Sequence, residues 1–176
     1  MINKLIICFC VLLVGCENEK DVSISRNQDA EYKNIIMYGD SLCAENNSAA
    51  DKLSIMKNCK SGRKLVDGFD FNQDYNYIIL ALGTNDIIKQ TDIKRFTEKA
   101  SYLAAKSDLC ILPNINQKKD SEMYIDALSN VCEAYLSPVD DCAVSIGNPD
   151  GVHYIEQDYI ALSECIKNKL IIDGAI

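Results

Sequence analysis

The feature that most constrains the fold of this chain is a continuous, mainly apolar run, "YNYIILAL", at residues 75–82. A run of strand length without polar alternation is typical of a parallel strand that is covered on both faces. Shorter apolar runs predict strands at residues 34–38 and 109–112, and residues 143–146 could form a last short strand. We therefore expect a parallel β-sheet at the centre of the fold.

Helical patterns lie between these runs. Apolar residues recur every three to four positions at residues 48–57, 91–106, 121–136 and 156–170, with Thr91 as the expected cap of the second helix. Strands that alternate with helices of this length indicate a parallel sheet with helices on both faces. The fold class that we expect is α/β, as a three-layer α/β/α sandwich.

The N-terminus has a separate pattern. Lys4 precedes an apolar run at residues 5–14 that is too short to span a bilayer as a stable helix, which is the layout of a secretory signal. The letters "LVGC", which end at Cys16, resemble the lipobox of bacterial lipoproteins. This resemblance implies that residues 1–15 are a signal peptide that is removed and that Cys16 receives a diacylglycerol. A plain signal peptide is the alternative.

The segment after this cysteine is polar and has no hydrophobic period. We expect residues 16–33 to be a lipidated cysteine and a tether, and residues 34–176 to be one domain. The lipoprotein resemblance places this domain in the bacterial cell envelope, facing the periplasm and held to a membrane through Cys16. In such proteins an Asp after the lipidated cysteine goes with the inner membrane, so Glu17 favours the outer membrane.

The charge of the chain limits the classes of partner that it can bind. Eighteen basic and 26 acidic residues give a formal net charge of −8, and no basic stripe occurs that could neutralise phosphates. We therefore expect no nucleic-acid partner. We also expect no cofactor and no metal, because one histidine in the chain supplies a zinc site poorly. The sequence does not fix the oligomeric state, and a monomer is favoured.

Cysteine use agrees with an oxidising compartment. Of nine cysteines, Cys8 and Cys10 lie in the signal and Cys16 would be lipidated. An even number is left and none stands in a CxxC pair, which predicts disulfides; buried free thiols are the alternative. The disulfide candidates are Cys43, Cys59, Cys110, Cys132, Cys142 and Cys165.

Polar residues that suit nucleophilic chemistry follow two of the expected strands. "GDSL" begins at Gly39 and "GTND" begins at Gly83, and the carboxyl ends of parallel strands open on one edge of a sheet. A serine hydroxyl such as that of Ser41 needs a base before it can attack. The only imidazole belongs to His153, and Asp150, three residues earlier, could hold its Nδ1–H. These residues would form a Ser-His-Asp triad.

Four motifs together resemble the sequence blocks of the SGNH (GDSL) hydrolase family: "GDSL" at residues 39–42, Gly62, "GTND" at residues 83–86 and "DGVH" at residues 150–153. The resemblance covers the chain from about residue 34 to its C-terminus. It implies a flavodoxin-like sheet, with Ser41 as nucleophile, His153 as base and Asp150 as the residue that orients the imidazole.

The same resemblance implies an oxyanion hole. Its donors would be the backbone N–H groups of Ser41 and Gly62 and the side chain of Asn85, with Gly68 as a competitor for the place of Gly62. The neighbouring acids, Asp40 and Asp86, are expected to fix their turns through backbone hydrogen bonds rather than to take part in catalysis.

The cysteines near these motifs suggest one pairing. A bridge between Cys43, two residues after the nucleophile, and Cys59, three before Gly62, would tie the two oxyanion-hole loops together. The remaining bridges would then be Cys132 with Cys142 and Cys110 with Cys165. The spacing alone does not separate these pairings from others.

The expected function is hydrolysis of small or polymeric carboxylic esters through an acyl-enzyme. An acetyl or short-acyl esterase of the cell envelope suits the expected location. A lysophospholipase or thioesterase, an acyltransferase with the same triad, and a non-catalytic envelope lipoprotein with an esterase-like fold are the alternatives.

Overall fold

The computed structural model describes residues 34–69, 71, 74–115, 120–145 and 148–176. The expected signal peptide, Cys16 and the tether lie outside the described residues. Within the described part of the chain, no helix is both long and apolar enough to cross a membrane.

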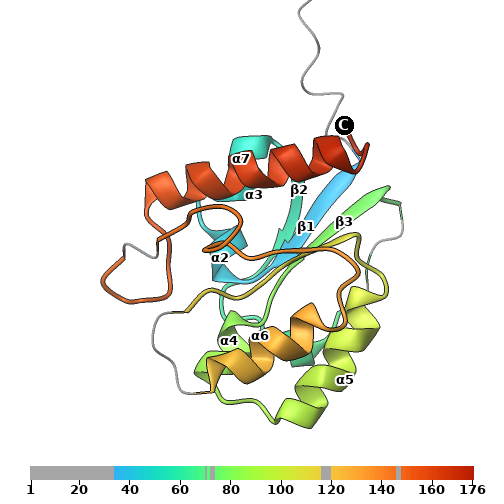
Figure 1. Cartoon of the computed structure of the whole chain (residues 1–176), viewed down its shortest axis with the longest axis vertical. Coiled ribbons are helices and arrows are strands. Elements are labelled where there is room, and N and C mark those ends of the chain that lie inside the picture. Colours follow the sequence, from blue (N-terminus) through green and yellow to red (C-terminus); the bar gives the residue numbers. More distant parts are fainter. Residues whose placement is uncertain (1–33, 70, 72–73, 116–119, 146–147) are drawn as a thin grey trace, which may run out of the picture.

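Five parallel strands form one sheet, whose central strands are visible in Figure 1. They are β1 (Ile35–Gly39), β2 (Met56–Cys59), β3 (Tyr77–Ala81), β4 (Leu109–Ile111) and β5 (Tyr135–Leu136). Their order is β2-β1-β3-β4-β5, with Ile36 paired to Ile78 and Leu80 to Cys110. This is the flavodoxin-like order, in which the direction of winding reverses between β1 and β3.

Helices cover both faces of the sheet, so the expected three-layer sandwich is confirmed. On one face lie α3 (Ala49–Leu53) and α7 (Glu156–Ile172), and on the other lie α4 (Thr84–Ile88), α5 (Ile93–Ala104) and α6 (Ser121–Ser129) (Figure 1). Side chains alternate along the central strands: Met37 belongs to the same buried cluster as Leu162 of α7, while Ile36 belongs to the cluster of Leu103 of α5.

Two predicted helices are shorter than expected, and each is followed by a strand. The helix predicted at 48–57 ends at Leu53, because Ser54 adopts a left-handed conformation, and β2 follows. The helix predicted at 121–136 ends at Ser129, and β5 follows. These prediction errors have one cause. Both strands lie at sheet edges and are too short or too exposed to show an apolar run.

Two smaller predictions also need correction. Residues 143–145 form no strand; Ala143 has a positive φ and the chain turns there, whereas residue 146 lies outside the described residues. The cap of α5 is Asp92, whose carboxylate accepts a hydrogen bond from the N–H of Arg95, so Thr91 is not the cap.

Three disulfides join the six candidate cysteines. The bridge from Cys43 to Cys59 is present as predicted. The other two predicted pairs are wrong, because the bridges observed are Cys110–Cys132 and Cys142–Cys165. Cys110 lies in β4 and its side chain belongs to the core of the α5–α6 face. It therefore meets Cys132 after α6, while Cys165 of α7 lies on the opposite face.

Candidate active site

The turn after β1 carries Ser41, and its close packing restricts which residues fit there. Gly39 ends the strand, and a Cβ atom on it would lie 2.6 Å from the Cβ of Cys43, so only glycine fits. Ser41 then opens the short helix α2 (Ser41–Ala44), and Asp40 caps it by accepting a hydrogen bond of 3.1 Å from the N–H of Leu42. The hydroxyl of Ser41 is thereby placed at the carboxyl end of β1, beside the point where the winding reverses.

Asp40, in this turn, is fully buried. Burial raises the pKa of its carboxyl from 3.8 to about 6, and the Leu42 N–H and the side chains of Thr84 and Asn85 act in the opposite direction. Among the described residues, its Oδ2 atom has no partner at ordinary hydrogen-bond length, so the polar neighbours offset the burial only partly. Asp40 fixes the turn, which agrees with the role expected for it.

Asp150 organises the loop before α7. Its Oδ1 atom accepts hydrogen bonds from the backbone N–H groups of Val152, at 2.8 Å, and His153, at 2.9 Å. Its Oδ2 atom lies 2.6 Å from Nδ1 of His153. The imidazole contact, followed by the two backbone N–H groups, lowers the pKa of Asp150 to about 2. The carboxylate can therefore only accept, and Nδ1 of the imidazole carries the proton.

The two segments meet across the carboxyl edge of the sheet. The Nε2 atom of His153 lies 3.1 Å from Oγ of Ser41, although 112 residues separate them in sequence. Since Nδ1 holds its proton toward Asp150, Nε2 is free to accept the proton of the Ser41 hydroxyl. The geometry is that of a nucleophile, a base and an orienting carboxylate.

The loop after β3 brings Asn85 to the same edge. Gly83, in a left-handed conformation with φ of 119°, starts α4, and a Cβ atom there would lie 2.7 Å from Pro113. Asn85 is the second residue of α4, and its side chain interacts with Asp40. This is the position from which a side-chain amide could donate to an oxyanion beside Ser41.

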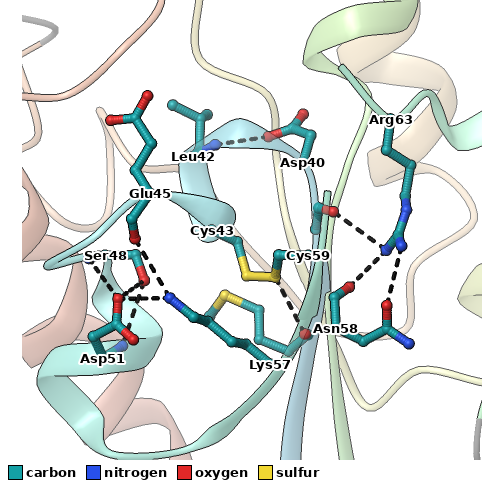
Figure 2. The surroundings of a disulfide bond; sticks show 12 residues. Asp40, Leu42, Cys43, Glu45, Ser48, Asp51, Lys57, Asn58, Cys59 and Arg63 are labelled. Atoms are coloured by element: carbon teal, nitrogen blue, oxygen red, sulfur yellow. Dashed lines mark hydrogen bonds and ion pairs between the residues drawn. A yellow bond between two sulfur atoms is a disulfide. The ribbon is translucent and has the colours of Figure 1, made fainter. Parts of the chain in front are cut away.

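Gly62 lies in the turn that follows β2. That turn is held against the end of β1, because the N–H of Lys60 donates to the carbonyl of Gly39 at 3.1 Å and Arg63 reaches the same carbonyl at 3.4 Å (Figure 2). Gly62 has a φ of 76° and no neighbour where a Cβ would stand, so its backbone faces open space. Gly68 instead ends a separate 3₁₀ turn, η1 (Leu65–Asp67).

Asp86 has a different role from the one expected. Its buried carboxylate accepts hydrogen bonds from the N–H groups of Leu65, at 2.6 Å, and Val66, at 3.4 Å, so it fixes η1, and it also interacts with the side chain of Thr91 after α4. Burial raises the pKa of Asp86, and the two N–H groups oppose this shift. Its role is structural, as predicted, but it acts on a distant segment.

Sequence reasoning missed Glu45, which follows α2. One of its carboxylate oxygens lies 3.5 Å from Nε2 of His153, on the side of the imidazole that faces Ser41. About half of the Glu45 side chain is exposed. A lone glutamate after a short polar stretch gives no sequence signal, because the contact exists only once the distant loop has folded over α2.

An apolar cavity of about 30 Å³ lies beneath α2. Its lining includes Leu42, next to the nucleophile, together with Thr84, Pro113 and Tyr154. Within the described residues, no group of three or more His, Cys, Asp or Glu side chains is placed to hold a metal ion.

Comparison with known proteins identifies the fold. No protein-family model matches the chain, and no curated protein matches its sequence. A psychrotrophic esterase from Pseudoalteromonas sp. has a similar structure, with a TM-score of 0.60 and 16% identity, covering 78% of this chain and 99% of that chain. A carbohydrate esterase of family 3 from Talaromyces cellulolyticus gives a TM-score of 0.59 and 14% identity, covering 79% and 96%.

A third similar structure is a GDSL-like lipase from Bacteroides thetaiotaomicron, with a TM-score of 0.57, 16% identity and coverage of 84% of this chain and 91% of that chain. The chain thus spans nearly the full length of each of these proteins. It has the α/β/α sandwich fold that these esterases and lipases share.

Proposed function

We propose that this chain is a serine hydrolase of the SGNH (GDSL) type that cleaves carboxylic esters through an acyl-enzyme. The observation that carries the proposal is the line of contacts from Asp150 to His153, at 2.6 Å, and from His153 to Ser41, at 3.1 Å. The shared fold of solved esterases supports it. Asn85, Gly62 and the N–H of Ser41 are the proposed oxyanion donors.

The proposed reaction has two matching halves. Oγ of Ser41 bonds to the ester carbonyl carbon while Nε2 of His153 takes its proton, and the ester C–O bond then breaks as Nε2 gives that proton to the leaving alcohol. Water repeats these steps on the acyl-enzyme, which releases the carboxylic acid and restores Ser41. Asp150 keeps the imidazole in the required tautomer throughout.

The finer proposal is an acetyl or short-acyl esterase of the bacterial cell envelope. The cavity beneath α2, at about 30 Å³, suits a short acyl group better than a long chain. The location rests on the lipobox-like sequence before Cys16, which would hold the domain at a membrane, the outer membrane being favoured.

The test is a panel of p-nitrophenyl esters of increasing acyl length. We expect acetate to be the best substrate, and Ser41→Ala to lower kcat/KM by about 10⁴-fold with unchanged circular dichroism. Ser101→Ala, on the exposed face of α5, is the matched control and should keep full activity. A Ser41→Ala protein as active as the unmodified chain would contradict the mechanism. Faster turnover of long-chain esters would instead favour the lysophospholipase alternative.

A further inference from the structure

Glu45 occupies a place that the proposed triad does not use. Its side chain follows α2 and its carboxylate lies 3.5 Å from Nε2 of His153, the same atom that faces Ser41 at 3.1 Å. In Figure 2 this carboxylate points away from Lys57 and toward the end of α2 where Leu42 and Asp40 lie. Lys57 donates instead to the backbone carbonyl of Glu45 and to the side chain of Asp51.

The Glu45 carboxylate is therefore not neutralised by a neighbouring base. Among the described residues, no lysine or arginine nitrogen lies within 4.0 Å of it, and the ring nitrogen that it approaches is Nε2 of His153, at 3.5 Å. The carboxylate of Asp150 lies at the other ring nitrogen, Nδ1, so the charge beside Nε2 is that of Glu45. The space beside Nε2 consequently carries negative charge, which an incoming substrate meets before it reacts.

Proton transfer fixes which part of the substrate enters this space. In the proposed mechanism Nε2 gives its proton to the leaving alcohol, so the ester oxygen must come within about 3 Å of Nε2. Because Glu45 lies 3.5 Å from the same nitrogen, that oxygen lies within about 7 Å of the carboxylate. The acyl group is attached to the carbonyl carbon and needs no contact with Nε2.

We propose that Glu45 is a specificity-determining residue that selects the leaving alcohol by its charge. It favours alcohols with a cationic group or with hydroxyl donors near the ester oxygen, and it disfavours alcohols with a phosphate or carboxylate there. This inference rests on the proposed esterase function. Two charges at about 6 Å in a partly solvated site change a rate by about 3-fold to 10-fold, less at high salt.

The experiment uses three acetyl esters of unactivated alcohols, so that the leaving group needs its proton. They are acetylcholine, its uncharged isostere 3,3-dimethylbutyl acetate, and the anionic 2-acetoxyacetate. For the unmodified full chain with its disulfides formed, we expect kcat/KM to fall about 3-fold to 10-fold at each step from cation to neutral to anion. Raising the salt concentration from about 0.01 M to about 0.5 M shortens the screening length, so these ratios should move toward one.

Variants of Glu45 distinguish selection of the leaving alcohol by charge from other roles of this residue. Glu45→Gln should bring the three esters to similar kcat/KM values, and Glu45→Lys should reverse their order. Glu122→Gln, on exposed α6 of the opposite face, removes the same charge and should leave the ratios unchanged. The proposal is overturned if Glu45→Gln lowers all three rates by one factor, because Glu45 would then act only through the imidazole. Unchanged ratios in both Glu45 variants would also overturn it.

Failure of the underlying function has a distinct result. If Ser41→Ala hydrolyses the three esters as fast as the unmodified chain, or if neither hydrolyses any of them, both the esterase function and the role of Glu45 fall together. Ser41-dependent turnover without charge discrimination contradicts the role of Glu45 alone.

Discussion

Ser41 and His153 lie 3.1 Å apart, but the segments that carry them are built differently. Ser41 is 8% exposed and is the first residue of α2, a helix that follows a central strand and is tied to the sheet by a disulfide. His153 lies in a partly exposed loop, and its side chain is 30% exposed. Its position depends on Asp150, whose two oxygens bind the backbone and the ring of the same loop.

This difference shows how the site divides two tasks. The nucleophile is held by the fold, so changes around it should cost stability as well as activity. The base is held by a local turn, so changes there should cost activity and leave the fold intact. Substitutions in the two segments should therefore separate a loss of activity from a loss of stability.

The largest effect is expected on the side of the base. Asp150→Asn should lower kcat/KM for a short-chain ester by about 10³-fold, since the amide cannot hold the Nδ1 proton in the required tautomer. The free energy of unfolding should fall only modestly, because the amide oxygen of Asn can still accept the two backbone N–H bonds and the side chain of Asp150 is 46% exposed. Esterase kinetics and urea unfolding of one preparation measure both. A large loss of stability would show that the loop belongs to the core.

The next variant removes the proposed oxyanion donor Asn85, which lies at the carboxyl edge of the sheet where the two segments meet. Asn85→Ala should lower kcat by about 10²-fold to 10³-fold while KM changes little, because the donor acts mainly on the charge of the transition state. Steady-state kinetics on the same ester give both constants. A change confined to KM would assign Asn85 to substrate binding instead.

The disulfide beneath the nucleophile should affect stability and activity together. Replacing Cys43 and Cys59 by Ala opens a loop of 16 residues and should lower the unfolding free energy by about 3 kcal/mol. The same change should lower kcat/KM by about 10-fold, since α2 loses its link to β2.

The matched control is the bridge between β4 and the segment after α6, whose loop holds no residue of the proposed triad. Replacing Cys110 and Cys132 opens a loop of 22 residues and should cost a similar free energy, with kcat/KM preserved in the folded protein. Equal losses of activity in both double variants would mean that the bridge near Ser41 has no special influence on the site.

The smallest effect concerns the pH dependence of stability around Asp40. Its pKa is about 6 in the folded chain against 3.8 for the free carboxyl, so its neutral form stabilises the fold below pH 3.8. That contribution is lost as the pH rises through 6. Asp40→Asn keeps an acceptor for the Leu42 N–H and cannot ionise.

Between pH 4 and pH 7, this variant should therefore gain about 2–3 kcal/mol of unfolding free energy relative to the unmodified chain. Chemical unfolding at both pH values measures the difference. Asp120→Asn, at an exposed position, is the control. A parallel pH dependence in the Asp40→Asn variant and the unmodified chain would show that Asp40 ionises without cost.

The elements that were best predicted from the sequence are those with a large buried face. The run at residues 75–82 became β3, and the helical period behind it became α5, because burial leaves a continuous or periodic apolar pattern. The edge strand β2 was missed, since three of its four residues are exposed and "MKNC" has no such pattern. Its pairing with β1 comes from tertiary structure alone.

The site was predictable to a similar degree. Ser41, Asp150 and His153 belong to short motifs, and the structure brings them together as the motifs suggested. Glu45 and two of the disulfides were not predictable, because their partners come from segments whose distance depends on the face of the sheet that each helix covers. Local pattern contains no information about that choice.

The edges of the sheet bear on how these domains behave when many are crowded together. An edge strand offers free backbone groups that can recruit a strand of a neighbouring chain, and short or charged edges limit this. Here β5 has two residues, and β2 has four, among them Lys57 paired with Asp51. Neither edge strand is long enough for stable pairing with a strand of a second copy. At high protein concentration, the domains should therefore not associate through their sheet edges.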